Sequence, residues 1–261
     1  MPAWERRLGY VRPMTAANCV GGKLSRVDLL ETRHGRRDPV RRMQVVAVRL
    51  EAVTFDVSDA PLVAAFWAGL LDREVLAEPG GIFAPGTNTQ VGLRFVSSLA
   101  EQVGRPRLHL HVTSSSLEHQ QRTIETALRL GARQLDVGQG PDVAFVVLAD
   151  PGGNEFCVIE PGRNYFVGTG YLGEVTCDGT RDVGLFWRDA LGWPLVWDQN
   201  EQTAVQSPLG GTKIAWDLWD RPRVERKPGG TRQRFDLVTA DPAREAERLV
   251  SLGAIRLPDP V

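Results

Sequence analysis

The strongest candidates for chemistry in this sequence are two histidines that alternate with apolar residues. His109 and His111 lie in the run Arg107–Thr113, in which they alternate with Leu108, Leu110 and Val112. If this run is a strand, successive side chains point to opposite faces, so both imidazoles lie on the face away from the core. Such a pair can serve as a general base or as a metal ligand. It is also common on a solvated strand face.

The same alternation places further polar or titratable side chains on that face of neighbouring strands. These residues are Thr54, Asp56, Arg94, Glu155 and Cys157. Together they predict a polar cleft that could bind an anionic small molecule through Arg94 and the histidine pair. Proton transfer is the other possibility, with His109 or His111 as base and Asp56 or Glu155 as its partner.

Three of these residues also have an ordinary structural interpretation. Cys157 lies between two apolar residues and could be a small buried side chain. Asp56 could help to cap the helix expected to begin near Ser58. Arg94 could pair with an acidic residue at the surface.

The elements that must position these residues recur in four similar units from residue 45 onward. The first unit is expected to contain a strand at 45–57, a helix that begins near Ser58, and strands at 74–77, 81–84 and 90–96. The second repeats this order, with strands at 107–113, 133–137, 143–148 and 155–159 around a helix that ends at Gly131. Both units therefore predict the order β-α-β-β-β.

Units three and four repeat the first pair. Phe66-Trp67 recurs as Phe186-Trp187, and Leu130-Gly131-Ala132 recurs as Leu252-Gly253-Ala254. We therefore expect two domains, at 45–162 and 170–261, joined by a linker at 163–169. The last unit has too few residues for its final hairpin, so the second domain is expected to be incomplete at its C-terminal end. Its open sheet edge would be covered by a second chain in a homodimer, by the N-terminal segment, or by nothing.

Composition excludes several classes of protein. The chain has 261 residues, of which 42% are hydrophobic, enough for one large or two modest cores. Its longest apolar run, 143–149, is too short to cross a membrane, and its three cysteines are too scattered for a disulfide framework. We expect a cytoplasmic protein without a membrane partner.

Charge is unevenly distributed along the chain. Residues 1–42 carry a net charge of +6 and the remainder carries −7. The basic segment lacks a helical stripe and regularly spaced aromatic residues, so residues 1–44 are expected to be a disordered extension. Nucleic acid is not expected as a partner.

Four motifs together resemble the vicinal oxygen chelate superfamily, and glyoxalase-like tandem proteins most of all. They are Val53-Thr-Phe-Asp-Val57, the Phe-Trp pair at 66–67, the Leu-Gly-Ala helix end at 130–132, and Asp150-Pro-Gly-Gly-Asn-Glu-Phe-Cys-Val158. The resemblance implies an α+β fold of tandem glyoxalase-like domains, in which paired β-α-β-β-β units close a curved sheet around a cleft. Members of that superfamily include glyoxalase I, extradiol dioxygenases, fosfomycin-modifying transferases and bleomycin-sequestering proteins, so the fold alone does not fix the chemistry.

The resemblance also bears on a metal. Enzymes of the superfamily usually hold a divalent ion with His, Gln or Glu from the first and last strands of each unit. The matching positions here hold Ala52, Arg94, His109 and Cys157, so His109 is the one ordinary ligand and no metal centre is assigned. If a metal binds, the family implies Zn, Ni, Mn or Fe.

The second copy has Glu174, Asp217 and Arg234 at three of the equivalent positions. These two carboxylates could chelate a hard metal ion. Because Arg234 replaces the histidine, ion pairing of Arg234 with Glu174 or Asp217 is the preferred interpretation.

The leading hypothesis is therefore a glyoxalase-like protein that binds a small polar or aromatic molecule in the first-domain cleft, without the usual metal. Its expected ligand-binding residues are Thr54, Arg94, His109, His111 and Cys157. The alternative is a metal-dependent lyase, isomerase or dioxygenase that acts on a vicinal-oxygen substrate with His109 as a ligand.

Overall fold

The computed structural model describes residues 22–27, 48–99, 107–138, 143–217 and 232–256. The first unit comprises β2 (Val48–Val57), α1 (Ala60–Leu71), β3 (Leu76–Glu78), β4 (Gly81–Ala84) and β5 (Gly92–Ser97). The second comprises β6 (Leu108–Val112), α2 (Leu117–Arg129), β7 (Arg133–Gln134), β8 (Phe145–Ala149) and β9 (Glu155–Ile159).

The third unit contains β10 (Leu172–Asp178), α3 (Arg181–Leu191), β11 (Leu195–Gln199), β12 (Gln202–Gln206) and β13 (Lys213–Asp217). The described part of the fourth contains β14 (Gln233–Thr239) and α4 (Pro242–Ser251). A short 3₁₀ helix, η2 (Asn164–Phe166), lies in the segment between units two and three. The predicted α+β fold of repeated β-α-β-β-β units is confirmed.

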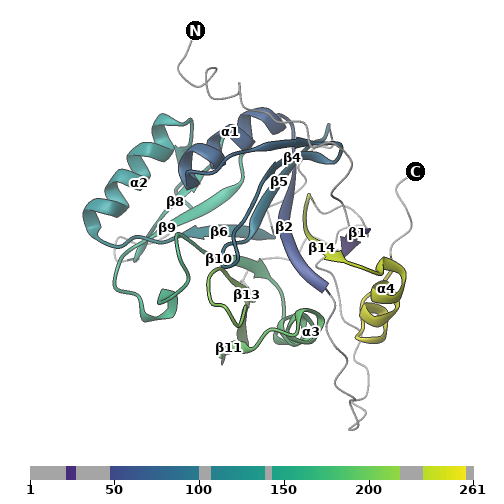
Figure 1. Ribbon diagram of the computed structural model, residues 1–261. Coiled ribbons are helices and arrows are strands. Elements are labelled where there is room, and N and C mark those ends of the chain that lie inside the picture. Colours follow the sequence, from purple (N-terminus) through teal and green to yellow (C-terminus); the bar gives the residue numbers. More distant parts are fainter. Residues whose placement is uncertain (1–21, 28–47, 100–106, 139–142, 218–231, 257–261) are drawn as a thin grey trace.

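The strands form two sheets, and each sheet joins an early unit to a late one (Figure 1). Sheet A has the order β1-β14-β2-β5-β4-β3 and combines units one and four. Sheet B has the order β11-β12-β13-β10-β6-β9-β8-β7 and combines units two and three. In both, the first strands of the two units pair antiparallel, β14 with β2 and β10 with β6.

This pairing corrects the prediction of a first-domain cleft. Units one and two were expected to share one curved sheet, with Arg94 and the histidine pair on the same cleft. Instead Arg94 lies on sheet A, and His109 and His111 lie on sheet B. The repeats are similar in sequence, so local patterns do not specify which first strands pair.

The exposed edge of β14 pairs with a strand from the basic N-terminal segment. β1 (Gly22–Val27) runs antiparallel to β14, from Gly22 opposite Thr239 to Val27 opposite Phe235, and Figure 1 shows it beside α4. The expected disorder of 1–44 therefore does not hold for these six residues, and 1–21 and 28–44 lie outside the described residues. A second chain, the N-terminal segment or nothing was expected at the open edge of the second domain, and the N-terminal segment is what pairs with it.

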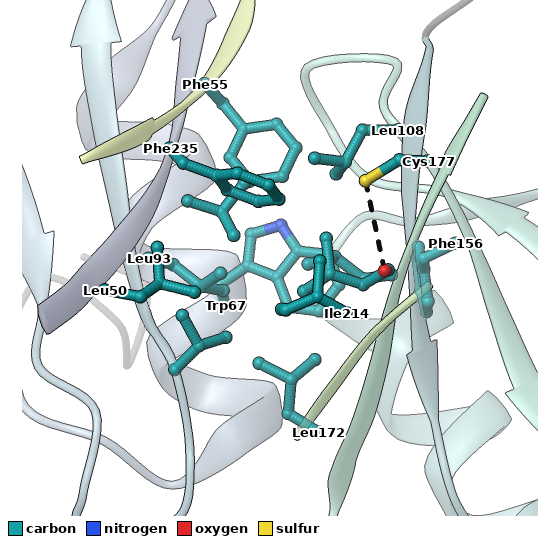
Figure 2. Close-up of a cluster of buried hydrophobic side chains, with 14 of the residues drawn as sticks. Leu50, Phe55, Trp67, Leu93, Leu108, Phe156, Leu172, Cys177, Ile214 and Phe235 are labelled. Atoms are coloured by element: carbon teal, nitrogen blue, oxygen red, sulfur yellow. Dashed lines mark hydrogen bonds between the residues drawn. The ribbon is translucent and has the colours of Figure 1, made fainter. Parts of the chain in front are cut away.

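The core lies between the two sheets and contains one Phe-Trp pair from each of two helices. Figure 2 shows Trp67 of α1 with Phe55 and Phe235 of sheet A on one side and Phe156 of sheet B on the other. The Trp67 and Phe156 ring centroids are 5.1 Å apart. On α3, Trp187 contacts Phe235 at 4.9 Å in an edge-to-face arrangement, which is favourable for aromatic pairs. The sheets therefore turn their apolar faces toward each other and their polar faces outward.

The Asp150-Pro-Gly-Gly-Asn turn ties α1 to the β8–β9 hairpin. The buried carboxylate of Asp150 accepts a hydrogen bond from the Trp67 indole N–H at 2.9 Å and further bonds from Asn154. Gly153 has a φ of 81°, and a Cβ at Gly152 would lie 2.8 Å from a methyl group of Val63. This turn, which begins the 150–158 motif of the family resemblance, is therefore structural.

Helix α1 starts largely as its sequence predicts. Asp59 is the N-cap and accepts a hydrogen bond from the backbone N–H of Leu62, with Pro61 in the first turn. Phe66 and Leu70 are buried, but Leu62, which shares their helical spacing, is 45% exposed. None of the helices in the described ranges is long and apolar enough to span a membrane.

Candidate functional site

Four side chains from four adjacent strands lie in one row on the outer face of sheet B. His111 on β6 pairs in register with Cys157 on β9 and with Glu174 on β10, and Glu174 pairs with Lys213 on β13. Residues paired in register on neighbouring strands share a face. We call this row, together with His109, the histidine face.

Short contacts link three members of the histidine face. His111 Nδ1 lies 2.7 Å from Glu174 Oε2, and His111 Nε2 lies 2.8 Å from His109 Nε2. One potential ligand atom from each of His109, His111 and Cys157 falls within a mutual distance of 4.8 Å. Nδ1 of His111 therefore contacts Glu174, and Nε2 of the same ring contacts His109.

The surroundings of His111 and Glu174 favour their charged forms when no metal is bound. Burial alone would lower the pKa of His111, but its interactions with Cys157 and Glu174 outweigh burial and raise this pKa to about 10. Burial alone would raise the pKa of Glu174. Hydrogen bonds from His111, Tyr165 and Thr176 hold it below its ordinary value instead. The pair is an imidazolium and a carboxylate in the metal-free chain.

The segment that was predicted to be only a linker covers the histidine face. Tyr165 of η2 donates its hydroxyl hydrogen bond to Glu174, and its backbone carbonyl accepts one from Lys213 Nζ. The ammonium also lies 4.0 Å from the Tyr165 ring centroid, a cation–π geometry. Phe166 packs against a small apolar cluster that contains Cys157. Tyr165 and Lys213 are thus site residues that the sequence analysis missed.

Glu155 was a candidate partner for a catalytic histidine. It pairs with Ala149 at the beginning of β9, two residues before Cys157. Among the described residues, no hydrogen bond or ion pair joins Glu155 to His109 or His111. Glu174 contacts His111 instead.

Sheet A carries a different group of side chains, which we call the arginine cluster. Arg94 is 3% exposed and its guanidinium contacts three carboxylates: Glu51 at 2.9 Å, Glu78 at 3.2 Å, and Asp236. It also lies 4.5 Å from the ring centroid of Phe83. Burial alone would lower the pKa of Arg94, but the three carboxylates outweigh burial and raise this pKa above its ordinary value. The guanidinium therefore remains charged.

Thr54 and Asp56 belong to this same region of sheet A. Thr54 is buried and donates a hydrogen bond of 2.8 Å to Asp236. Asp56 forms an ion pair with Arg234 at 2.6 Å. The expected pairing of Arg234 with Glu174 or Asp217 is therefore wrong, because β14 pairs with β2 of sheet A and not with sheet B. Two of the five expected ligand-binding residues, Thr54 and Arg94, are engaged in internal interactions.

Glu51 joins the arginine cluster because β2 contains an irregularity. The register with β14 shifts between the pairs Asp236–Ala52 and Leu237–Leu50, so Glu51 is an extra residue. Leu50 and Val53 both lie in the core as a result, although strict alternation would put them on opposite faces. A period-two analysis therefore places Ala52, and not Glu51, beside Arg94.

The two sheets differ in their fitness for a metal ion. On sheet A, the guanidinium of Arg94 occupies the space among the carboxylates, so the residues there do not fit a cation. On sheet B, two imidazole nitrogens and a thiol sulfur converge, and such nitrogen and sulfur donors suit Zn²⁺. Within the described residues, the histidine face fits a divalent ion.

Known proteins support the fold. A family model for a glyoxalase-like domain matches residues 52–159 and 174–260. No curated protein matches the sequence. Glyoxalase I from Zea mays is similar over 78% of this chain and 79% of that chain, at 14% identity and a TM-score of 0.53. A mutant of the Zea mays enzyme has the same identity and coverage and a TM-score of 0.51.

At 14% identity, the likeness to the Zea mays structures shows the fold alone. The two segments matched by the family model together span well over half of the chain and coincide with the repeated units. This chain therefore belongs to the glyoxalase-like domain family, as a tandem member of the vicinal oxygen chelate superfamily.

Proposed function

We propose that the histidine face is the functional site of a metal-dependent enzyme that acts on a small polar or aromatic molecule. His109, His111 and Cys157 are the proposed ligands. The observation that carries this proposal is that their potential ligand atoms lie within 4.8 Å of one another, while Glu174 contacts Nδ1 of His111. This centre replaces the single-ligand arrangement that the sequence suggested for His109.

The donor set favours Zn²⁺ among the ions considered. Two imidazoles and one thiolate are ligands typical of zinc, and a site with three protein ligands leaves a position open for substrate or water. A carboxylate behind a ligating imidazole fixes its tautomer and orientation, which is the arrangement of Glu174 and His111. Mn²⁺ prefers oxygen ligands, so this set suits it less.

A bound ion would polarise two neighbouring oxygens of a substrate and stabilise negative charge that develops on them. The chain's own residues would support this chemistry in three ways. Glu174 holds the proton of His111 on Nδ1 and leaves Nε2 as the donor. Tyr165 donates to the other carboxylate oxygen of Glu174 and so fixes its orientation. The Phe166 ring lies 5.9 Å from the His111 ring and packs against the apolar cluster that contains Cys157, which would restrain the imidazole. A lyase or isomerase is the class that a zinc ion suits best.

The second candidate function is metal-free binding of an anionic molecule on the same face. The distance of 2.8 Å between the histidine Nε2 atoms favours it, because this is a hydrogen-bond distance that requires a proton between them. His111 and Lys213 would then supply positive charge. The predicted role of Arg94 in ligand binding has no support from its contacts, since three carboxylates already surround it.

Elemental analysis of purified protein, with calorimetric titration of Zn²⁺, Ni²⁺, Mn²⁺ and Fe²⁺, separates the two candidates. The variants are His109→Ala and Cys157→Ala. His119→Ala is the matched control, because His119 lies on α2 and stacks on Tyr171, away from the proposed ligands. We expect about one Zn²⁺ per chain in wild type and in the control, and loss of tight binding in both test variants.

Two outcomes would count against the metal. Equal zinc content in His109→Ala and wild type would remove His109 from the ligand set. Wild-type protein without metal and without a titratable site would overturn the first candidate and leave metal-free binding.

A further inference from the structure

Lys213 is a buried cation that forms no ion pair with a carboxylate in the described part of the chain. Its residue exposure is 7%, and among the described residues no carboxylate oxygen lies within 4 Å of Nζ. Its two contacts are a hydrogen bond to the backbone carbonyl of Tyr165 and the face of the Tyr165 ring. Buried lysines are nearly always paired, because an unpaired ammonium loses its hydration without compensation. This position therefore needs a further explanation.

Neutralising Glu174 does not explain Lys213. The two residues are neighbours in register across β10 and β13, yet the lysine side chain bonds to Tyr165 instead. Glu174 already receives donors from His111, Tyr165 and Thr176. Both of its carboxylate oxygens therefore already accept hydrogen bonds, and none of these comes from Lys213.

The acceptor that Lys213 now uses is one that a ligand could replace. A backbone carbonyl is neutral, whereas a carboxylate would form a stronger, charge-assisted hydrogen bond with the same ammonium. Tyr165 lies in the segment between Gly162 and Gly168, both at positive φ and both with open space around the Cβ position. If a ligand oxygen took the place of the Tyr165 carbonyl beside Lys213, the segment could move at these two glycines without breaking a contact with the core.

We infer that Lys213 binds the anionic group of the small molecule held on the histidine face, and that this molecule is a carboxylate. The inference rests on the proposed function for the location of the ligand. It does not depend on whether the neighbouring histidines hold an ion or a proton. Burial lowers the pKa of Lys213 more than the nearby charge of Glu174 raises it.

The lysine content of the chain allows this inference to be tested directly. Lysine occurs only at positions 23, 213 and 227, so the full chain labelled with ¹³C-lysine gives three Cε signals, and Lys213→Met identifies one of them. Benzoate is the probe, because it combines a carboxylate with a ring that suits the face beside Phe166. Benzamide, which has the same shape without the charge, is the control ligand. We expect benzoate to shift the Lys213 signal and benzamide to leave it in place.

Calorimetry on three proteins gives the matching affinities. We expect Lys213→Met to bind benzoate at least about tenfold more weakly than wild type, and Lys213→Arg to stay within about threefold because it keeps the charge. Benzamide should bind all three proteins equally. Equal benzoate affinity in wild type and Lys213→Met would overturn the inference. If Lys213→Met does not fold, Lys213→Arg identifies the Lys213 signal, and an unmoved signal in wild type at saturating benzoate would overturn the inference.

Metal analysis of the same samples separates this inference from the proposed function. Zinc retained in Lys213→Met together with weaker benzoate binding supports both. A metal-free wild type that still binds benzoate through Lys213 overturns the metal proposal and leaves the inference standing. Zinc in both wild type and Lys213→Met, together with equal benzoate affinity in the two, supports the metal proposal and overturns the inference about Lys213.

Discussion

The Nε2 atoms of His109 and His111 lie 2.8 Å apart, while the other ring nitrogen of His111 lies 2.7 Å from Glu174. Two unprotonated nitrogens would repel at this separation, so one of them carries a proton in the metal-free chain. A metal ion bound by both would take the place of that proton. Zinc uptake should therefore release protons and weaken as the pH falls.

The first prediction concerns the stability of the metal-free protein. The pKa of His111 is raised from 6.5 to about 10. The stabilisation from its charged form is thus complete below pH 6.5 and disappears as the pH rises toward 10. The free energy of unfolding should fall across this window with a slope of at most about 1.4 kcal/mol per pH unit.

Urea unfolding of chelator-treated protein at pH 6, 8 and 10 measures this slope. The excess loss of stability should be absent in His111→Gln and present in His119→Gln, because no carboxylate contacts His119 among the described residues. Parallel curves for wild type and His111→Gln would contradict the assigned charge.

The second prediction concerns metal preference. Cys157→Asp replaces a soft sulfur donor by a hard oxygen donor at the same position of the row. The ratio of Zn²⁺ to Mn²⁺ affinity should fall by at least about tenfold, as measured by competition calorimetry. Cys177→Ala is the control, because Cys177 is buried in the core and this change should lower stability without altering the ratio. An unchanged ratio in Cys157→Asp would exclude the sulfur as a ligand.

Sequence patterns predict the repeated units of this fold because the signals that define them are local. Asp59 and Pro61 mark the beginning of α1, and alternation in Leu108–Val112 marks β6. The pairing of units is set by long-range contacts instead. One such contact joins the sheets, where the Gln233 side chain exchanges hydrogen bonds with the backbone of Leu108. No periodicity in either strand encodes this contact.

The candidate site was predicted in part. Strand alternation places His109, His111 and Cys157 on one face, as observed, but it could not detect Glu51, which needs the bulge in β2. Tyr165 lies in a segment without periodicity, so no pattern indicated it. Lys213 and Asp217 point to the same face of their strand, so alternation alone cannot decide which of them lies beside Glu174. The sequence analysis grouped Asp217 with Glu174, but the residue paired with Glu174 is Lys213, four positions earlier. Register across strands is a tertiary property, and residue type alone does not fix it.

The third prediction concerns the arginine cluster. Arg94→Met keeps an unbranched side chain but removes the buried cation that three partly buried carboxylates share. We expect a loss of about 3–5 kcal/mol in the free energy of unfolding, measured with urea at pH 7. Arg49→Met is the control, since Arg49 is exposed and its ion pair with Glu51 is 3.6 Å long. That change should cost less than about 1 kcal/mol. Similar losses for the two variants would show that Arg94 does not hold the cluster together.

The fourth prediction concerns the hydroxyl group of Tyr165. Tyr165→Phe removes the hydrogen bond to the charged Glu174 while keeping the ring and the carbonyl that Lys213 contacts. Hydrogen bonds to charged groups contribute about 1.5–3 kcal/mol, so we expect a loss in this range in urea unfolding at pH 7. Zinc content should not change, because the proposed ligands are untouched.

Tyr171→Phe is the matched control for this variant. Its hydroxyl bonds to the neutral hydroxyl of Thr123 at 3.1 Å, so the loss should be only about 0.5–1.5 kcal/mol. The difference between the two variants measures the charge on Glu174 and should shrink as the pH falls below the pKa of that carboxyl group, which lies under its ordinary value. Equal losses for the two variants at pH 7 would mean that Glu174 is neutral. Glu174 could then be neither the counterion of His111 nor the carboxylate that orients it toward a metal.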